Sequence, residues 1–201
     1  MTGKTSTFFA AVSRMKYIER WSLMRSSRPE SLSEHSLEVA MIAHALCTIA
    51  NIRFGRTLNA EKAALVGLYH DASEIITGDL PTPIKYYNPD IRDAFKGVEA
   101  KADERLISKL PEDLQRVYTE IFLPQDADDD EAYMRGLVKA ADKLSALIKC
   151  IEERKSGNSE FRMAEKSIQE SLDRMCESFP EVQMFLDEFL PPYGGTLDEL
   201  K

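Results

Sequence analysis

Residues 59–78, NAEKAALVGLYHDASEIITG, hold the pattern from which the fold of this chain is predicted. Asn59 is a good helix N-cap, and Gly78 suits the position just past a helix end. We therefore predict a helix through Thr77 that carries His70 and Asp71 near its middle. Since residues three or four apart share a helix face, Glu74 should lie beside both of them. Asp79 follows just beyond the helix end.

The rest of the chain also carries signals of helices. Ser31-x-x-Glu34 forms a capping-box pattern before an apolar run, and no convincing stretch alternates with a period of two. Further helices are expected from Asp90, after Pro111, and up to about Lys155. We predict an all-α, single-domain helical bundle over residues 1–201, with a core at about 30–155 and C-terminal helices at about 158–190. No Pro/Gly/Ser-rich linker divides the chain.

Composition narrows the function classes. The 201 residues carry a net charge of −8, which argues against a nucleic-acid or anionic-membrane surface. The longest uncharged run, residues 39–52, is 14 residues long, whereas spanning a bilayer takes about 20. We therefore expect a buried core helix and no membrane association. The three cysteines form no CxxC pair, which favours reduced thiols and a cytoplasmic location.

A candidate metal site comes from the order of four residues along the chain, His35, His70, Asp71 and Asp142. Two imidazoles and two carboxylates suit a borderline divalent metal, which can activate water against a phosphate ester. Asp142 is flanked by small and apolar residues, so it should be buried and need a partner or a metal. His44, nine residues after His35, should point to the opposite helix face and is not expected to be a ligand.

The motifs around these residues resemble those of the HD-domain superfamily of metal-dependent phosphohydrolases. They are Ser33–Ser36, Tyr69–Glu74, Gly78–Pro81 and Lys139–Asp142. The match is closer to one branch, the bacterial 5′-deoxynucleotidases, which also carry an Arg-Trp pair near the N-terminus. That pair is matched here by Arg20-Trp21, and residues 77–86 look like the same branch. The resemblance is strong over about residues 8–155.

This resemblance implies a role for each matched residue. The metal ligands would be His35, His70, Asp71 and Asp142; the catalytic carboxylates Glu74 and Asp79; and the substrate-binding residues Arg20, Trp21 and Asp79. Enzymes of this branch remove the 5′-phosphate from 2′-deoxynucleoside 5′-monophosphates and form homodimers. The expected cofactor is one divalent ion, Co²⁺, Mn²⁺ or another borderline transition metal.

The chemistry of the Arg-Trp pair agrees with these roles. Arg20 offers a planar fork of donors for a terminal phosphate. Trp21 would crowd the 2′ carbon of the sugar, although an apolar wall alone rejects an added hydroxyl by only about a hundredfold.

Other functions stay open at the level of sequence. One is another HD phosphohydrolase, either a cyclic-nucleotide phosphodiesterase or a nucleoside triphosphohydrolase. A triphosphate would need several basic groups, and the nearby candidates are Arg20, Lys85 and Arg92. A second alternative is a non-catalytic nucleotide- or metal-binding module, which is less favoured because binding alone would not require Glu74 and Asp79. A third is a helical interaction scaffold.

Overall fold

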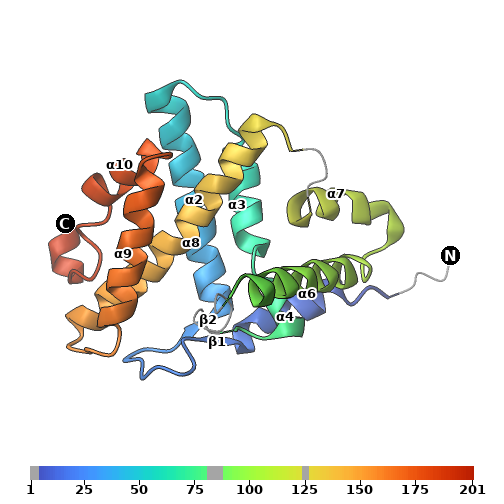
Figure 1. The fold of residues 1–201 in the computed structure, drawn as a ribbon, viewed down its shortest axis with the longest axis horizontal. Coiled ribbons are helices and arrows are strands. Elements are labelled where there is room, and N and C mark those ends of the chain that lie inside the picture. Colours follow the sequence, from blue (N-terminus) through green and yellow to red (C-terminus); the bar gives the residue numbers. More distant parts are fainter. Residues whose placement is uncertain (1–4, 81–87, 124–126) are drawn as a thin grey trace. The chain divides into compact units, whose positions relative to one another are not determined.

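The computed structural model describes residues 5–80, 88–123 and 127–201 (Figure 1). Helices dominate it, so the predicted all-α class is confirmed. The α-helices are α1 (Phe8–Val12), α2 (Leu32–Phe54), α3 (Ala60–Tyr69), α4 (Glu74–Thr77), α6 (Pro89–Ile107), α7 (Glu112–Phe122), α8 (Asp129–Lys155), α9 (Arg162–Cys176) and α10 (Pro180–Glu188). The 3₁₀ helices are η1 (Ser13–Tyr17) and η2 (Leu197–Leu200), and two short strands, β1 (Glu19–Arg20) and β2 (Glu30–Ser31), pair antiparallel.

The chain divides into two compact units. The first contains Met1–Leu23, Glu30–Ser36 and Tyr69–Asp126, and the second contains Met24–Pro29, Leu37–Leu68 and Ala127–Lys201. Three of the four predicted metal ligands belong to the first unit, and Asp142 belongs to the second.

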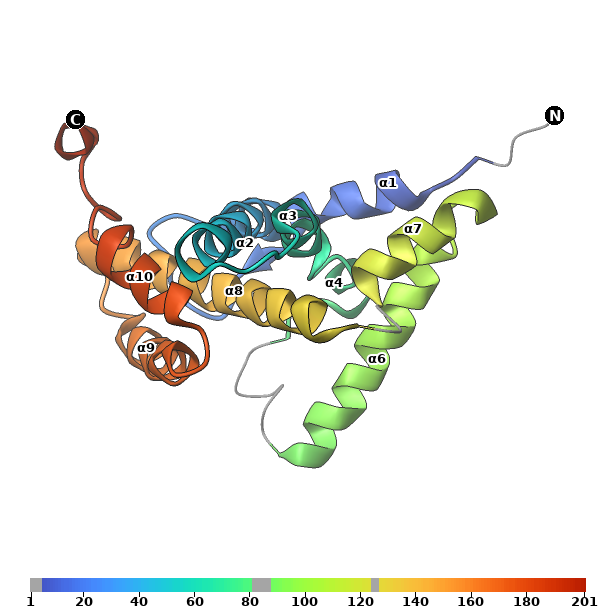
Figure 2. The same cartoon turned by 90° about the horizontal axis from the view of Figure 1, so that it is seen from above.

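The core of the first unit gathers residues that are distant in sequence. Its fully buried members include Leu32 at the start of α2, Ala72 before α4 and Leu106 on α6. Figure 2 shows α6 beside α7, and the ring of Tyr118 on α7 lies 4.9 Å from that of Phe8. Because Leu32 and Ala72 share this core, it fixes the two segments that carry His35 and Asp71.

In the second unit, α9 packs against α8 and α10 packs against α9 (Figure 1). Helices α2 and α3 approach closely at Gly67, where an added Cβ would lie only 3.0 Å from Ala40 Cα. A buried pair on α8, Lys149 and Glu153, anchors the loop 24–29: Lys149 Nζ donates to Arg28 O at 2.6 Å, and Ser27 N donates to Glu153 at 2.8 Å.

The single helix predicted through Thr77 is wrong. Helix α3 ends at Tyr69, and α4 begins at Glu74. Between them, backbone bonds of the i→i+3 kind replace the helical pattern, with Ala72 N on Tyr69 O and Glu74 N on Asp71 O, both at 3.0 Å. Burial of Ala72 in the first core accompanies this break. His70 and Asp71 therefore lie in a turn.

Helix α2 begins as predicted. The Ser31 backbone N–H and hydroxyl both contact Glu34 Oε2, at 2.8 and 2.9 Å, so the capping box is confirmed. Among the described residues, α2 is the helix long and apolar enough to cross a membrane by length and composition. A soluble core helix passes the same test, and residues such as Val39, Ala43 and Leu46 are fully buried.

Candidate active site

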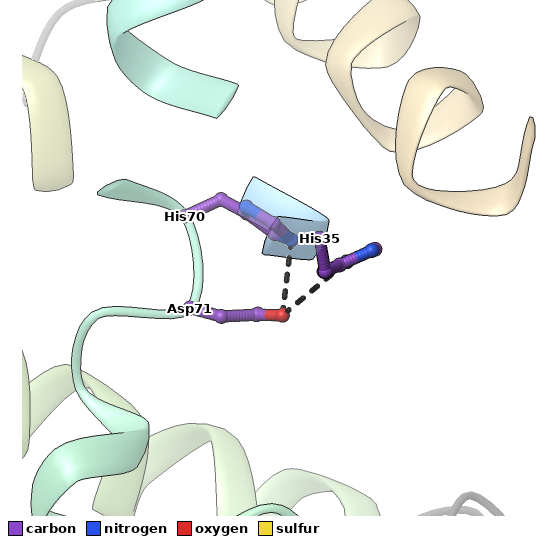
Figure 3. Close-up of side chains that lie close together, drawn as sticks. All are labelled: His35, His70 and Asp71. Atoms are coloured by element: carbon purple, nitrogen blue, oxygen red, sulfur yellow. Dashed lines mark ion pairs between the residues drawn. The ribbon is translucent and has the colours of Figure 1, made fainter. Parts of the chain in front are cut away.

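The turn between α3 and α4 directs two neighbouring side chains to one point. His70 Nε2 lies 3.0 Å from Asp71 Oδ2, and His35 Nε2 from α2 lies 3.9 Å from the same oxygen. The two imidazole rings are 5.3 Å apart. Figure 3 shows the three side chains converging from these two segments. Adjacent helical residues diverge by about 100°, so the turn is what lets His70 and Asp71 converge.

These three residues fit a divalent metal. One ligand atom from each lies within 4.8 Å of the other two, and two imidazole nitrogens with a carboxylate oxygen form a set that borderline divalent ions accept. The His35 side chain is fully buried, whereas those of His70 and Asp71 are 16% and 24% exposed. The cluster thus has a buried side and an accessible side. His44 is exposed on α2, as expected for a histidine outside the site.

Asp142 lies on α8, in the second unit. The expectation that it is buried is wrong, because its side chain is 26% exposed and its Oδ2 lies 3.0 Å from Lys143 Nζ. The ammonium group of Lys143 offsets the negative charge of this carboxylate. A partly exposed carboxylate with such a neighbour does not require a metal to compensate its charge. Its part as a fourth ligand stays a prediction.

Glu74 and Asp79 stand at the two ends of the short helix α4. Glu74 is its first residue and is buried, and its backbone N–H donates to Asp71 O at 3.0 Å. Asp79 follows Gly78, whose φ of 76° and ψ of 159° end the helix in a conformation that favours glycine. Both predicted catalytic carboxylates are thus joined through α4 to the turn that carries His70 and Asp71.

Arg20 and Trp21 belong to a small hairpin that sequence reasoning did not anticipate. Arg20 is on β1 opposite Glu30 on β2, and β2 leads directly into α2 and His35. Glu30 Oε2 accepts hydrogen bonds from Arg20 Nη1 at 2.9 Å and from Trp21 Nε1 at 3.0 Å. Strands of two residues are too short to show an alternating pattern, so no pattern in the sequence indicates Glu30 as a partner.

Comparison with known proteins places this arrangement in a family. The family model described as 5′-deoxynucleotidase YfbR-like matches residues 7–193. The chain belongs to the YfbR-like 5′-deoxynucleotidase family. Among its relatives, a 5′-deoxynucleotidase of Vibrio parahaemolyticus is 47% identical, with 98% of this chain and 99% of the relative covered. The 5′-deoxynucleotidase YfbR of Escherichia coli O1:K1 is 45% identical, with coverages of 98% and 96%.

Solved structures show the same fold at lower identity. An HD-domain phosphohydrolase from Listeria innocua has a TM-score of 0.79 at 24% identity, with 95% of this chain and 90% of that chain covered. A cyanophage S-2L HD phosphohydrolase, solved with dA and one catalytic Zn²⁺ ion, has a TM-score of 0.61 at 22% identity, with coverages of 90% and 91%. The predicted HD-domain fold is therefore confirmed, and family membership confirms the predicted enzyme class of 5′-deoxynucleotidase.

One carboxylate near the site was missed in the sequence. Asp103 on α6 accepts a hydrogen bond from the Ser73 hydroxyl, in the turn that holds Asp71. Burial raises the pKa of Asp103 to about 7; the charges of Glu99 and Asp71 also raise it, and the Ser73 hydrogen bond partly opposes the shift. In sequence, Asp103 looks like any acidic residue of an amphipathic helix.

Of the basic groups considered for a triphosphate, Arg20 and Arg92 lie within the described residues. Arg92 on α6 is paired with its neighbour Asp93, with Nε and Oδ1 2.9 Å apart. Lys85 lies outside the described residues, as does the part of the family-like segment from Pro81 to Tyr86.

Proposed function

We propose that this protein removes the 5′-phosphate of 2′-deoxynucleoside 5′-monophosphates, with the cluster of His35, His70 and Asp71 as its metal centre. The observation that carries the proposal is the convergence of these three side chains in a chain of the 5′-deoxynucleotidase family. The products are a deoxynucleoside and inorganic phosphate.

The metal would be held by His35, His70 and Asp71, with Asp142 as the fourth ligand. The chemistry that a divalent ion supplies when bound is activation of water and neutralisation of phosphate charge. Imidazole and carboxylate donors suit several such ions, and we favour Co²⁺ or Mn²⁺ over Mg²⁺, which prefers oxygen ligands.

The remaining residues would act on the substrate directly. Glu74 and Asp79 are the general acid–base pair: one takes a proton from the attacking water and the other protonates the departing 5′-oxygen. Arg20 binds the phosphate through its planar guanidinium. Trp21 packs against the deoxyribose where a ribonucleotide would carry its 2′-hydroxyl, and Asp79 also contacts the substrate.

We also propose that the enzyme is a cytoplasmic homodimer that binds neither nucleic acid nor membrane, and that residues 1–201 form one HD domain. An apolar surface on the second unit supports the dimer. It contains exposed side chains from α2 and α3: Leu37, Met41, Ile52, Leu65 and Leu68. The three free cysteines agree with a reducing compartment.

Phosphate release from chelator-stripped protein tests the function. dAMP, AMP, the 3′-monophosphate of deoxyadenosine and dATP would each be assayed with added Co²⁺, Mn²⁺ or Mg²⁺. We expect release from dAMP alone, and none before metal is restored. Release from dATP alone would contradict the monophosphate assignment, and release from none of the four would contradict hydrolysis.

Substitutions separate the proposed roles. Glu74→Ala and Asp79→Ala should lose activity and keep their metal, measured by elemental analysis, whereas His70→Ala should lose both.

Trp21→Ala should lower the ratio of dAMP to AMP turnover by up to about a hundredfold, since an apolar wall discriminates against a hydroxyl to that extent. An unchanged ratio would remove Trp21 from the specificity scheme.

A further inference from the structure

Glu30 lies where the two proposed substrate residues meet. Its Oε2 atom accepts one hydrogen bond from the Arg20 guanidinium and another from the Trp21 indole, at 2.9 and 3.0 Å. The Arg20 guanidinium carbon is also 5.7 Å from the centre of the Trp21 ring. A single carboxylate oxygen therefore links the two side chains to each other.

The surroundings of this oxygen strengthen both contacts. The side chains of Arg20 and Glu30 are only 14% and 12% exposed, so their ion pair is screened less than one on the surface. The backbones of these two residues are paired in the β1–β2 ladder, which fixes the base of each side chain. The burial of both side chains further limits the rotamers open to them, so the charged hydrogen bond costs less conformational entropy than one between exposed side chains.

Trp21 has a backbone that a bulky residue rarely adopts. Its φ is +60°, in the left-handed region, and among the described residues it is the one non-glycine residue with a positive φ. Such conformations persist where surrounding contacts hold them and are frequent at functional sites. The bond from its indole to Glu30 is one of the contacts that hold it.

We propose that Glu30 is a positioning residue for substrate recognition, which sets Arg20 for the phosphate and Trp21 for the 2′ position of the sugar at the same time. This inference rests on the proposed function. Arg20 contacts Glu30 through Nη1, which is compatible with a bidentate phosphate contact along the Nε–Nη2 edge of the guanidinium. Phosphate binding and rejection of ribose are therefore coupled through one carboxylate.

Trp21 supplies a direct test, because it is the only tryptophan in the chain. The emission spectrum of the substrate-free protein reports this indole alone. Glu30→Ala removes the acceptor, so emission should shift and quenching by acrylamide should increase. Glu30→Gln keeps a carbonyl acceptor without the charge, so it should retain most of the wild-type emission. Glu19→Ala is the matched control, since Glu19 is an exposed acid on the same hairpin.

Kinetics test the coupling to substrate. For Glu30→Ala we expect KM for dAMP to rise about tenfold or more, and the dAMP-to-AMP ratio to fall to that of Trp21→Ala, with metal content unchanged. Glu30→Gln should raise KM while largely keeping the ratio. In a Trp21→Phe background, which lacks the indole N–H, Glu30→Ala should change the ratio no further.

The emission and kinetic measurements together distinguish failure of this inference from failure of the proposed function. Wild-type emission and an unchanged ratio in a folded Glu30→Ala variant, with folding checked by circular dichroism, would overturn the positioning role. If Glu30→Ala does not fold, Glu30→Gln decides, and an unchanged KM for dAMP would overturn the role. If the wild type hydrolyses no nucleotide, the proposed function fails, and an unshifted emission would still contradict the link between Glu30 and Trp21.

Discussion

Asp103 shows how a single residue can oppose stability near a functional site. Its carboxyl group is half-buried on α6, bonded to the Ser73 hydroxyl and close to the negative charges of Glu99 and Asp71. Burial is the main reason that its pKa rises from 3.8 to about 7. The folded protein therefore keeps a proton on Asp103 over a pH range in which the unfolded chain has released it.

This shift predicts the direction of a pH effect. Between about pH 4 and pH 7 the folded state binds more protons at Asp103 than the unfolded state does. Titration of Asp103 therefore lowers the free energy of unfolding as the pH rises across this window, and the loss is complete above about pH 7. Asp103→Asn keeps an acceptor for Ser73 and does not titrate. Urea unfolding of chelator-stripped protein at pH 5 and pH 8 should show a smaller loss of stability for Asp103→Asn than for the wild type.

The exposed neighbour Glu104 provides the control for this measurement. Glu104→Gln should leave the pH dependence of unfolding close to that of the wild type. If Asp103→Asn has the same pH dependence as both, Asp103 does not titrate as described.

At the scale of elements, the end of α4 sets the path of the chain towards Asp79. Gly78 has a φ of 76°, and a Cβ added there would meet nothing within 4 Å. The need for glycine is therefore conformational and not steric. Any other residue must either strain the backbone or change the direction in which the chain leaves α4.

Gly78→Ala should lower the free energy of unfolding by about 1–2 kcal/mol and reduce kcat/KM for dAMP at least tenfold by displacing Asp79. Gly55 is a matched control, because it also has a positive φ, 68°, and open space around an added Cβ. Gly55→Ala should cost similar stability with activity retained, as seen by urea unfolding and phosphate release. Equal activities for the two variants would contradict the role given to this helix end.

The elements also differ in how well they could be predicted from the sequence. The Ser31–Glu34 capping box and the long helix ending at Lys155 followed from local rules and are present. The β1–β2 hairpin and the break after Tyr69 depend on partners distant in sequence, such as the core contacts of Ala72. Propensities within a short window contain no information about those partners.

At the scale of the whole molecule, α2 has one face in the core of the second unit and another exposed to solvent. The exposed side of α2 includes Leu37, Met41 and Ile52, which are 55%, 59% and 77% exposed, and α3 also has exposed leucines, Leu65 and Leu68. Several exposed large apolar side chains on neighbouring helices are typical of interaction sites in soluble proteins. A second copy of the chain is the partner that we propose for these side chains.

Sedimentation equilibrium should therefore show a dimer for the wild type, and Met41→Glu should shift it towards monomer by placing a charge in the apolar contact. Met163 on α9 is also exposed, at 76%, and Met163→Glu should leave the dimer intact. A monomeric wild type, or equal association of the two variants, would contradict this interface.

The sequence alone determined the helical class, the family and the identity of the metal-binding and catalytic candidates. Helix caps and apolar spacing are local features, and the order of His35, His70, Asp71 and Asp142 can be read directly along the chain. The tertiary structure decided how these residues are used. It broke the expected helix after Tyr69 so that His70 and Asp71 converge with His35, and it joined Arg20 and Trp21 through Glu30. It also placed the half-buried Asp103 beside Ser73. These outcomes depend on packing between segments distant in sequence, and the free energy of such contacts exceeds the small local preferences that a sequence pattern reports.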